Sequence, residues 1–137
     1  MKIHHIGYAV KNIEEAIKNF KDLGYKTLGI LEADEKRKVK IQFMQNDNYT
    51  IELISPSGED SPIKNILTKI GNTPYHFCYE VENIERTIQM LKRKKYLLVE
   101  NISPAKAINN QKVAFLFNNE IGLIELLEKT KESAFNA

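Results

Sequence analysis

The chain has 137 residues, of which 42% are hydrophobic and 28% charged, and its formal net charge is +2. This size fits one compact domain spanning residues 1–137. The small charge argues against nucleic-acid binding, and no apolar run is long enough to span a bilayer or to act as a secretory segment. The single cysteine, Cys78, excludes an internal disulfide and fits a reducing compartment. We therefore expect a cytoplasmic protein that binds neither nucleic acid nor membrane.

The first part of the chain, about 2–56, has the pattern of a strand, a helix and three further strands. Residues 2–10 alternate in polarity as a strand does. Asn12, followed three residues later by Glu15, predicts the start of a helix, and Gly24 predicts its end. The remaining strands are expected at residues 26–31, 39–45 and 49–55.

A linker at about 57–72 separates this module from a second one. Ser61, followed by Pro62, predicts the N-terminus of a short helix that ends at Gly71. The second module, at about 73–128, repeats the order of the first, with Asn83 as the helix cap. Its elements are expected at 74–82, 84–94, 96–101, 111–118 and 121–128, before a polar tail at 129–137.

The two modules also resemble each other residue by residue. The segment from His5 to Glu14 returns as His76 to Glu85, 71 positions later (from 5 to 76), and keeps His, Tyr, Val, Asn, Ile and Glu. Ile51–Ile54 returns as Ile124–Leu127, 73 positions later (from 52 to 125). Each module alone has too little core to be stable, so we expect the two to pack together. The predicted fold class is α+β, with two tandem βαβββ modules.

Each module opens with a histidine in an apolar strand and closes with a glutamate between apolar neighbours. A carboxylate in such a strand is costly unless it is paired or bound to a metal ion. Taken singly, each residue is better explained as a packed histidine or a surface glutamate. Because the four occupy matching positions of a repeat, we predict one metal site formed by His5, Glu52, His76 and Glu125.

Imidazole nitrogen and carboxylate oxygen together suit borderline divalent ions such as Zn, Ni, Co, Fe or Mn. Two His and two Glu leave positions open for substrate, and an ion there can polarise a carbonyl group. His5 and His76 are then fixed ligands, while Glu52 and Glu125 are also candidate bases. His4 competes with His5 but is expected on the opposite strand face. Cys78 is expected to be a small core side chain.

These residues resemble the vicinal oxygen chelate superfamily, which includes glyoxalase I and methylmalonyl-CoA epimerase. The resemblance implies a curved mixed sheet around a U-shaped cleft that holds one divalent ion, with Ni, Co or Zn favoured, and a homodimer. It covers residues 2 to about 128 and is carried by His4–Val10, Leu23–Tyr25, Ile51–Pro56, Asp60–Ile63, Tyr75–Phe77 and Gly122–Leu126.

The resemblance implies a lyase or isomerase that moves a proton next to a carbonyl group through a metal-bound enediolate. Glutamate at position 52 favours a glyoxalase-I-like activity (lactoylglutathione lyase type) on a thiol conjugate. Ser61-Pro62-Ile63 and Gly122–Leu126 favour the alternative, a methylmalonyl-CoA epimerase-like enzyme acting on an acyl-CoA. Two departures leave the substrate open: Tyr75 stands where epimerases carry a first histidine, and the loop 103–110 lacks the expected glycines.

Other activities of the same superfamily are alternatives. A metal-dependent dioxygenase or a fosfomycin-type transferase uses two His and one Glu, which leaves Glu52 without a role. A metal-free small-molecule binding protein leaves all four side chains unused. Two basic clusters, Lys36–Lys38 and Lys92–Lys95, are best explained as solvated surface, and a docking site for an anionic substrate is the minor alternative.

Overall fold

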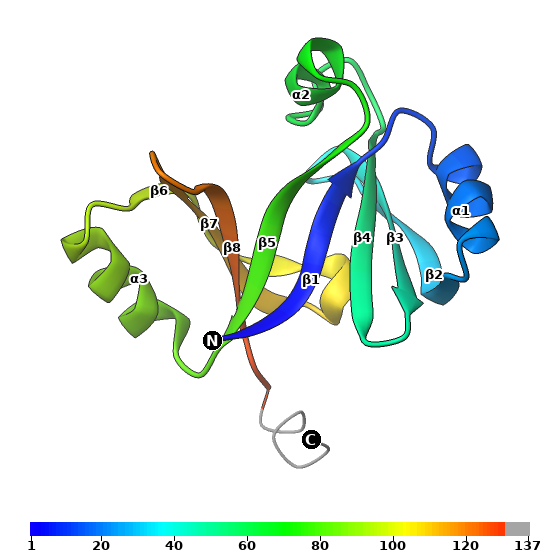
Figure 1. Ribbon diagram of the computed structural model, residues 1–137. Helices are drawn as coiled ribbons and strands as arrows, with labels where there is room; N and C mark the ends of the chain where they lie inside the picture. Colours follow the sequence, from blue (N-terminus) through cyan, green and yellow to red (C-terminus); the bar gives the residue numbers. More distant parts are fainter. Residues whose placement is uncertain (131–137) are drawn as a thin grey trace. The chain divides into compact units, whose positions relative to one another are not determined.

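The computed structural model describes residues 1–130 and divides the chain into two compact units (Figure 1). The first unit is His5–Tyr75, and the second consists of Met1–His4 and the chain from His76 onward. The boundaries fall inside the first strand of each predicted module, so each unit contains most of one module. The βαβββ order expected of both modules is confirmed.

The first unit is an α+β structure with a four-stranded mixed sheet in the order β2-β3-β4-β1. β1 and β4 are parallel, and the other neighbouring strands are antiparallel. The helix α1 begins as predicted, because the Asn12 side chain accepts a hydrogen bond from the Glu15 N–H at 3.0 Å. Its elements are β1 (Lys2–Ala9), α1 (Ile13–Asp22), β2 (Lys26–Asp34), β3 (Val39–Asn46), β4 (Tyr49–Pro56) and α2 (Lys64–Lys69).

The second unit repeats this arrangement, with the strand order β5-β8-β7-β6 and a parallel β5–β8 pair. The Asn83 side chain caps its helix by accepting a hydrogen bond from the Arg86 N–H at 3.0 Å. The Glu128 carboxylate accepts from the Ile84 N–H at the same helix end, also at 3.0 Å. Its elements are β5 (Thr73–Val81), α3 (Ile84–Arg93), β6 (Leu97–Ala105), the 3₁₀ turn η1 (Lys106–Ile108), β7 (Gln111–Asn118) and β8 (Gly122–Glu128).

Most predicted bounds lie within two residues of those in the structure, and three assignments differ in a way that matters. The linker helix α2 starts after Ile63 and has no side-chain cap, since the Ser61 carbonyl accepts the Lys64 N–H in a turn that precedes the helix. The strand expected at 26–31 continues to Asp34, past a break in register. The segment 103–110, expected to be a loop, begins as the end of β6 and continues as η1. Of the predicted tail 129–137, only residues 129 and 130 are described.

Each unit packs its helix and sheet around its own apolar core. In the first unit, Ile13 of α1 meets Met44, Ile51 and Leu53 of the sheet. In the second, Ile84, Ile88 and Leu91 of α3 meet a set from β5, β7 and β8: Val81, Ala114, Leu116, Ile124 and Leu126. Because side chains alternate along a strand, the residues between these core positions point to the other sheet face. Across residues 1–130, no helix is both long and apolar enough to cross a membrane.

Candidate metal centre

The first unit holds a buried histidine–glutamate pair on the sheet face opposite its core. Glu52 lies between the core residues Ile51 and Leu53 and therefore points away from them. In the parallel β1–β4 pair, Glu52 is in register with Gly7, two residues after His5. The His5 Nε2 atom lies 3.3 Å from Glu52 Oε1, and the two side chains are 0% and 6% exposed.

The second unit repeats this pair with the same geometry. Glu125 lies between the core residues Ile124 and Leu126, and it is in register with Cys78, two residues after His76. The His76 Nε2 atom lies 3.1 Å from Glu125 Oε1, and the side chains are 0% and 5% exposed. The repeat in sequence therefore becomes a repeat of buried nitrogen–oxygen pairs.

An aromatic ring completes each pair. Phe43 of β3 is in register with Glu52, and its ring packs edge-to-face on His5, with centroids 5.2 Å apart and an interplanar angle of 81°. Phe115 of β7 is in register with Glu125 and packs on His76 at 5.2 Å and 85°. Each imidazole therefore contacts both a carboxylate and an aromatic ring.

The geometry of each pair fits two ligands of one divalent ion. Metal–ligand bonds of about 2.1 Å place two ligand atoms roughly 3.0 Å apart at a right angle and roughly 3.4 Å apart in a tetrahedron. The observed separations of 3.3 and 3.1 Å lie between these limits. Imidazole and carboxylate are also the donors that borderline divalent ions prefer. The residues present therefore fit a metal ion such as Ni, Co or Zn.

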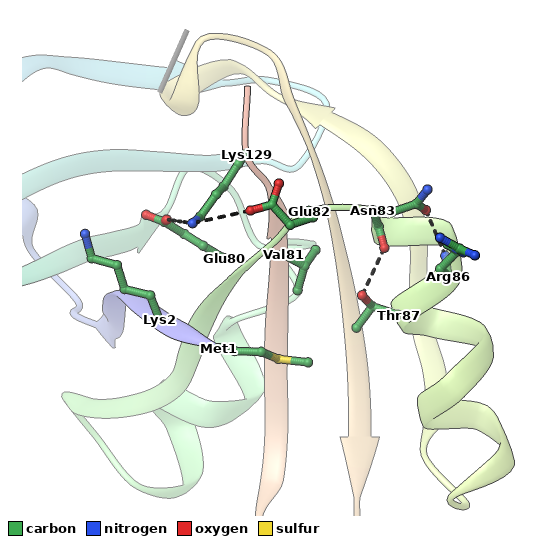
Figure 2. A pocket seen from close by; sticks show the side chains of 9 residues that line it. All are labelled: Met1, Lys2, Glu80, Val81, Glu82, Asn83, Arg86, Thr87 and Lys129. Carbon is green, nitrogen blue, oxygen red and sulfur yellow. Dashed lines mark hydrogen bonds and ion pairs between the residues drawn. The ribbon is translucent and has the colours of Figure 1, made fainter. Parts of the chain in front are cut away.

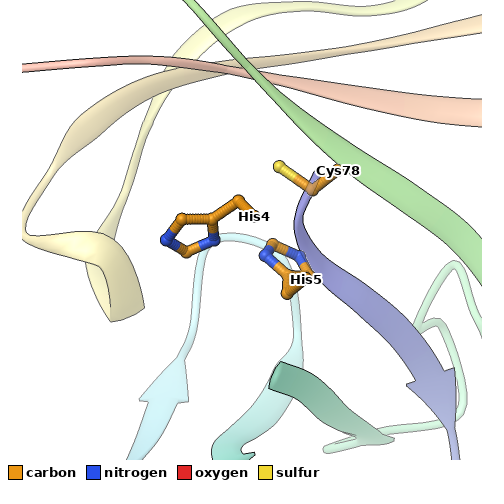
Figure 3. Close-up of side chains that lie close together, drawn as sticks. All are labelled: His4, His5 and Cys78. Atoms are coloured by element: carbon orange, nitrogen blue, oxygen red, sulfur yellow. The ribbon is translucent and has the colours of Figure 1, made fainter. Parts of the chain in front are cut away.

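The structure buries all four predicted site residues and brings His5 together with Glu52, and His76 with Glu125. His4, the competitor of His5, is half-buried, whereas His5 is 1% exposed. Cys78 is fully buried, as expected of a small core side chain. Figure 3 shows these two histidines in succession along β1 and the Cys78 side chain on β5.

The two aromatic rings are not among the predicted site residues, although the sequence contains a signal for them. Ile41-Gln42-Phe43-Met44 aligns with Val113-Ala114-Phe115-Leu116, 72 positions later (from 43 to 115), with the phenylalanine identical and the next residue apolar in both. This third matched segment lies between the histidine and glutamate segments in both modules. It could have marked Phe43 and Phe115 as equivalent positions of the repeat.

The second unit also has a surface pocket of about 430 Å³ that contains none of the predicted site residues. Figure 2 shows the Lys129 ammonium group between two carboxylates, 3.8 Å from Glu80 and 3.7 Å from Glu82. Asn83 and Thr87, at the start of α3, lie beyond Glu82 in Figure 2, and the Thr87 hydroxyl donates a hydrogen bond to the Asn83 carbonyl. Since these groups neutralise or satisfy one another, the pocket does not compete with the histidine–glutamate pairs as a metal centre.

The basic cluster of residues 36–38 is partly neutralised by neighbouring carboxylates. The Arg37 guanidinium group lies 3.2 Å from Asp34 Oδ2. Lys38 pairs with Asp60, and its hydrogen bond is the main reason that the pKa of the Asp60 carboxyl is lowered. These contacts favour the solvated-surface interpretation of this cluster.

Comparison with known proteins matches residues 4–115 to the family model of the Glyoxalase/Bleomycin resistance protein/Dioxygenase superfamily. The mitochondrial methylmalonyl-CoA epimerase of Mus musculus is 31% identical over 129 residues, which cover 91% of this chain and 71% of the mouse protein. A hypothetical protein from Bacillus halodurans C-125 has a similar crystal structure, with a TM-score of 0.85, 31% identity and 95% of each chain covered. Methylmalonyl-CoA epimerase from Mycobacterium tuberculosis shares the fold, with a TM-score of 0.83, 23% identity, and 97% of this chain and 91% of that one covered.

Proposed function

The chain belongs to the Glyoxalase/Bleomycin resistance protein/Dioxygenase superfamily, and we propose that it is a metal-dependent acyl-CoA epimerase of the methylmalonyl-CoA type. The observation that carries this proposal is the 31% identity to a methylmalonyl-CoA epimerase over 91% of the chain. The sequence patterns had placed a glyoxalase-I-like lyase first and the epimerase second. The relatives support the epimerase better than the lyase, and both reactions move a proton next to a carbonyl group.

We propose that His5, Glu52, His76 and Glu125 together hold one divalent ion, with Ni, Co or Zn the expected metal. The two pairs have matching strand positions, matching burial and nearly equal nitrogen–oxygen separations, as two halves of one site would. When bound, the ion would polarise the thioester carbonyl and so make the neighbouring C–H bond more acidic.

In the proposed reaction, the histidines act as ligands and the glutamates act as both ligands and bases. His5 and His76 offer Nε2 from rigid, buried positions and orient the ligand set. Each carboxylate has two oxygens, so one can serve as a ligand while the other exchanges a proton. In this proposal one glutamate removes the proton from C2 of the acyl group. The other glutamate returns a proton to the opposite face, which inverts the configuration at C2.

The test follows the proton at C2. The purified protein, loaded with Co²⁺, is incubated in D₂O with one epimer of methylmalonyl-CoA, and ¹H NMR records the loss of the C2 proton. In parallel, the same sample is assayed with the hemithioacetal of methylglyoxal and glutathione. We expect rapid exchange and epimerisation of the CoA ester and no turnover of the hemithioacetal.

The Glu125→Gln variant is compared with the wild type, since its amide keeps a ligand oxygen but cannot act as a base. It should lose C2 exchange of one epimer more than of the other. Turnover of the hemithioacetal without exchange at C2 of the CoA ester would restore the glyoxalase-I-like alternative. Inactivity towards both substrates in the metal-loaded wild type would refute proton-transfer catalysis of this kind. Homodimerisation and a cytoplasmic location stay predictions from the sequence.

A further inference from the structure

The aromatic rings beside the two histidines have a role that the proposed function does not assign. Phe43 and Phe115 lie at equivalent positions of the two units and contact the imidazoles with almost the same geometry: 5.2 Å and 81° in one, 5.2 Å and 85° in the other. Both side chains are only half-buried. The same ring contact beside the histidine of both units points to a role beyond filling space.

Packing of the apolar cores does not provide that explanation. The neighbours of Phe43 and Phe115 on the strand include Met44 and Leu116, which belong to the cores between helix and sheet. Because strand side chains alternate, the two phenylalanines point to the other face. On that face they are directly opposite Glu52 and Glu125 across the antiparallel pairs. The rings therefore line the carboxylate side of each sheet.

An imidazole needs such a neighbour if it is to act as a fixed ligand. The χ2 torsion of histidine has broad, roughly two-fold preferences, so the backbone alone does not fix the direction of Nε2. An edge-to-face aromatic contact restricts rotation of the ring. In both units the restricted orientation directs Nε2 at the glutamate oxygen, at 3.3 Å for His5 and 3.1 Å for His76.

We infer that Phe43 and Phe115 are positioning residues that hold His5 and His76 in the orientation required for metal binding. This inference rests on the proposed function, because it takes the two pairs as ligands of one ion. The rings act through the histidines rather than on the substrate. Losing one ring leaves one imidazole less restricted, although it still contacts its glutamate, so each loss weakens metal binding without removing a ligand atom.

The experiment compares the variants Phe43→Leu and Phe115→Leu with the wild type. Co²⁺ affinity is measured by competition with a chelator, and the ligand geometry is followed by the absorption spectrum of the bound Co²⁺. An aromatic contact of ordinary strength predicts about a 3- to 10-fold loss of affinity for each variant, with an altered spectrum. Phe43→Tyr and Phe115→Tyr keep the ring and should restore both readouts.

Phe20 supplies the matched control. Its ring packs edge-to-face on Tyr8 at 5.2 Å and 82°, against the core of the first unit and away from the histidines. Phe20→Leu should lower the thermal stability of the metal-free protein and leave the Co²⁺ affinity and spectrum unchanged. This control separates general loss of an aromatic contact from loss of ligand orientation.

The possible outcomes separate the inference from the proposed function. Leucine variants that bind Co²⁺ with wild-type affinity and spectrum would overturn the inference and leave the proposed function standing. A loss of affinity that tyrosine does not restore would also overturn it, since retention of the ring would then be irrelevant. A wild-type protein that fails to bind Co²⁺ at all would overturn the metal site, and the inference with it.

Discussion

Truncating the leucine next to each site glutamate tests whether the two sheet faces are separate in function. Leu53 and Leu126 are both 0% exposed and belong to the two cores. Replacing either by alanine removes three buried carbon groups, worth about 2.4 kcal/mol at roughly 0.8 kcal/mol each. The cavity left behind adds to this, so we expect a loss of about 3–5 kcal/mol in the free energy of unfolding. Domains are typically stable by about 5–15 kcal/mol, so a variant that loses about 3–5 kcal/mol should stay folded at 25 °C unless the wild type lies at the low end.

Urea unfolding of the metal-free protein measures this loss, and chelator competition measures the Co²⁺ affinity of the folded variants. We expect Leu53→Ala and Leu126→Ala to lose stability while their Co²⁺ affinity stays within about two-fold of wild type, since strand alternation directs these side chains away from the glutamates. Leu97→Ala, at a position 66% exposed, is the control and should change stability by less than about 0.5 kcal/mol. A fall in metal affinity as large as that of the Phe43→Leu variant would refute the separation of the faces.

Three further predictions follow from contacts described above. Asn83→Ala should cost about 1 kcal/mol in urea unfolding, because the Arg86 N–H loses its acceptor while the Ile84 N–H keeps Glu128. The pKa of the Glu85 carboxyl lies below its ordinary value of 4.5, first because of its own backbone hydrogen bond and second because of Lys112. The stability that this group contributes is therefore present above about pH 4.5 and is lost as pH falls through the lower pKa of the folded state. Glu85→Gln should flatten this part of a curve of unfolding free energy against pH. In the proposed epimerase, Glu52→Gln and Glu125→Gln should each slow C2 exchange of one epimer more than that of the other. Equal losses of exchange for both epimers would exclude two-base catalysis.

Local signals predicted the elements whose hydrogen bonds are themselves local. The caps at Asn12 and Asn83 each bond to an N–H three residues later, so the sequence contains both partners at a fixed spacing. Ser61 is also a residue type that often caps helices, but its side chain does not cap α2, because its carbonyl closes a turn with Lys64 before α2 begins. The end of β2 was missed for a different reason. The strand resumes pairing with β3 at Glu32, after a break in register that begins at Leu28, and pairing of this kind has no local sequence signal.

The site was predictable as far as the repeat reached. His5 and Glu52 were found because equivalent residues recur in the second module, while Phe43 needed knowledge of strand register. That register follows from the short hairpin turn at residues 47 and 48, where Asp47 adopts a positive φ of 54° and Asn46 pairs with Tyr49. Counting back along both strands from this pair brings Phe43 opposite Glu52. The strands expected at 39–45 and 49–55 leave only a short turn between them, so the missing step was the count of residues along the two strands.

The duplicated geometry bears on which proton-transfer reaction fits better. A glyoxalase-type reaction moves a proton between two neighbouring carbons, and one shuttling carboxylate is enough for it. An epimerase interconverts two configurations of one carbon whose free energies are nearly equal, so removal of the proton from either face should meet similar barriers. Two carboxylates in similar surroundings would give each face of that carbon a base of the same kind. Glu52 and Glu125 occupy equivalent positions in their strands. Each has its own imidazole partner, at 3.3 Å for Glu52 and 3.1 Å for Glu125, and each has a phenylalanine in register on the neighbouring strand. The near-identity of the two pairs therefore suits the proposed two-base epimerase, whereas the identity of residue 52 as glutamate favours the glyoxalase-I-like alternative, and the relatives carry the choice between them.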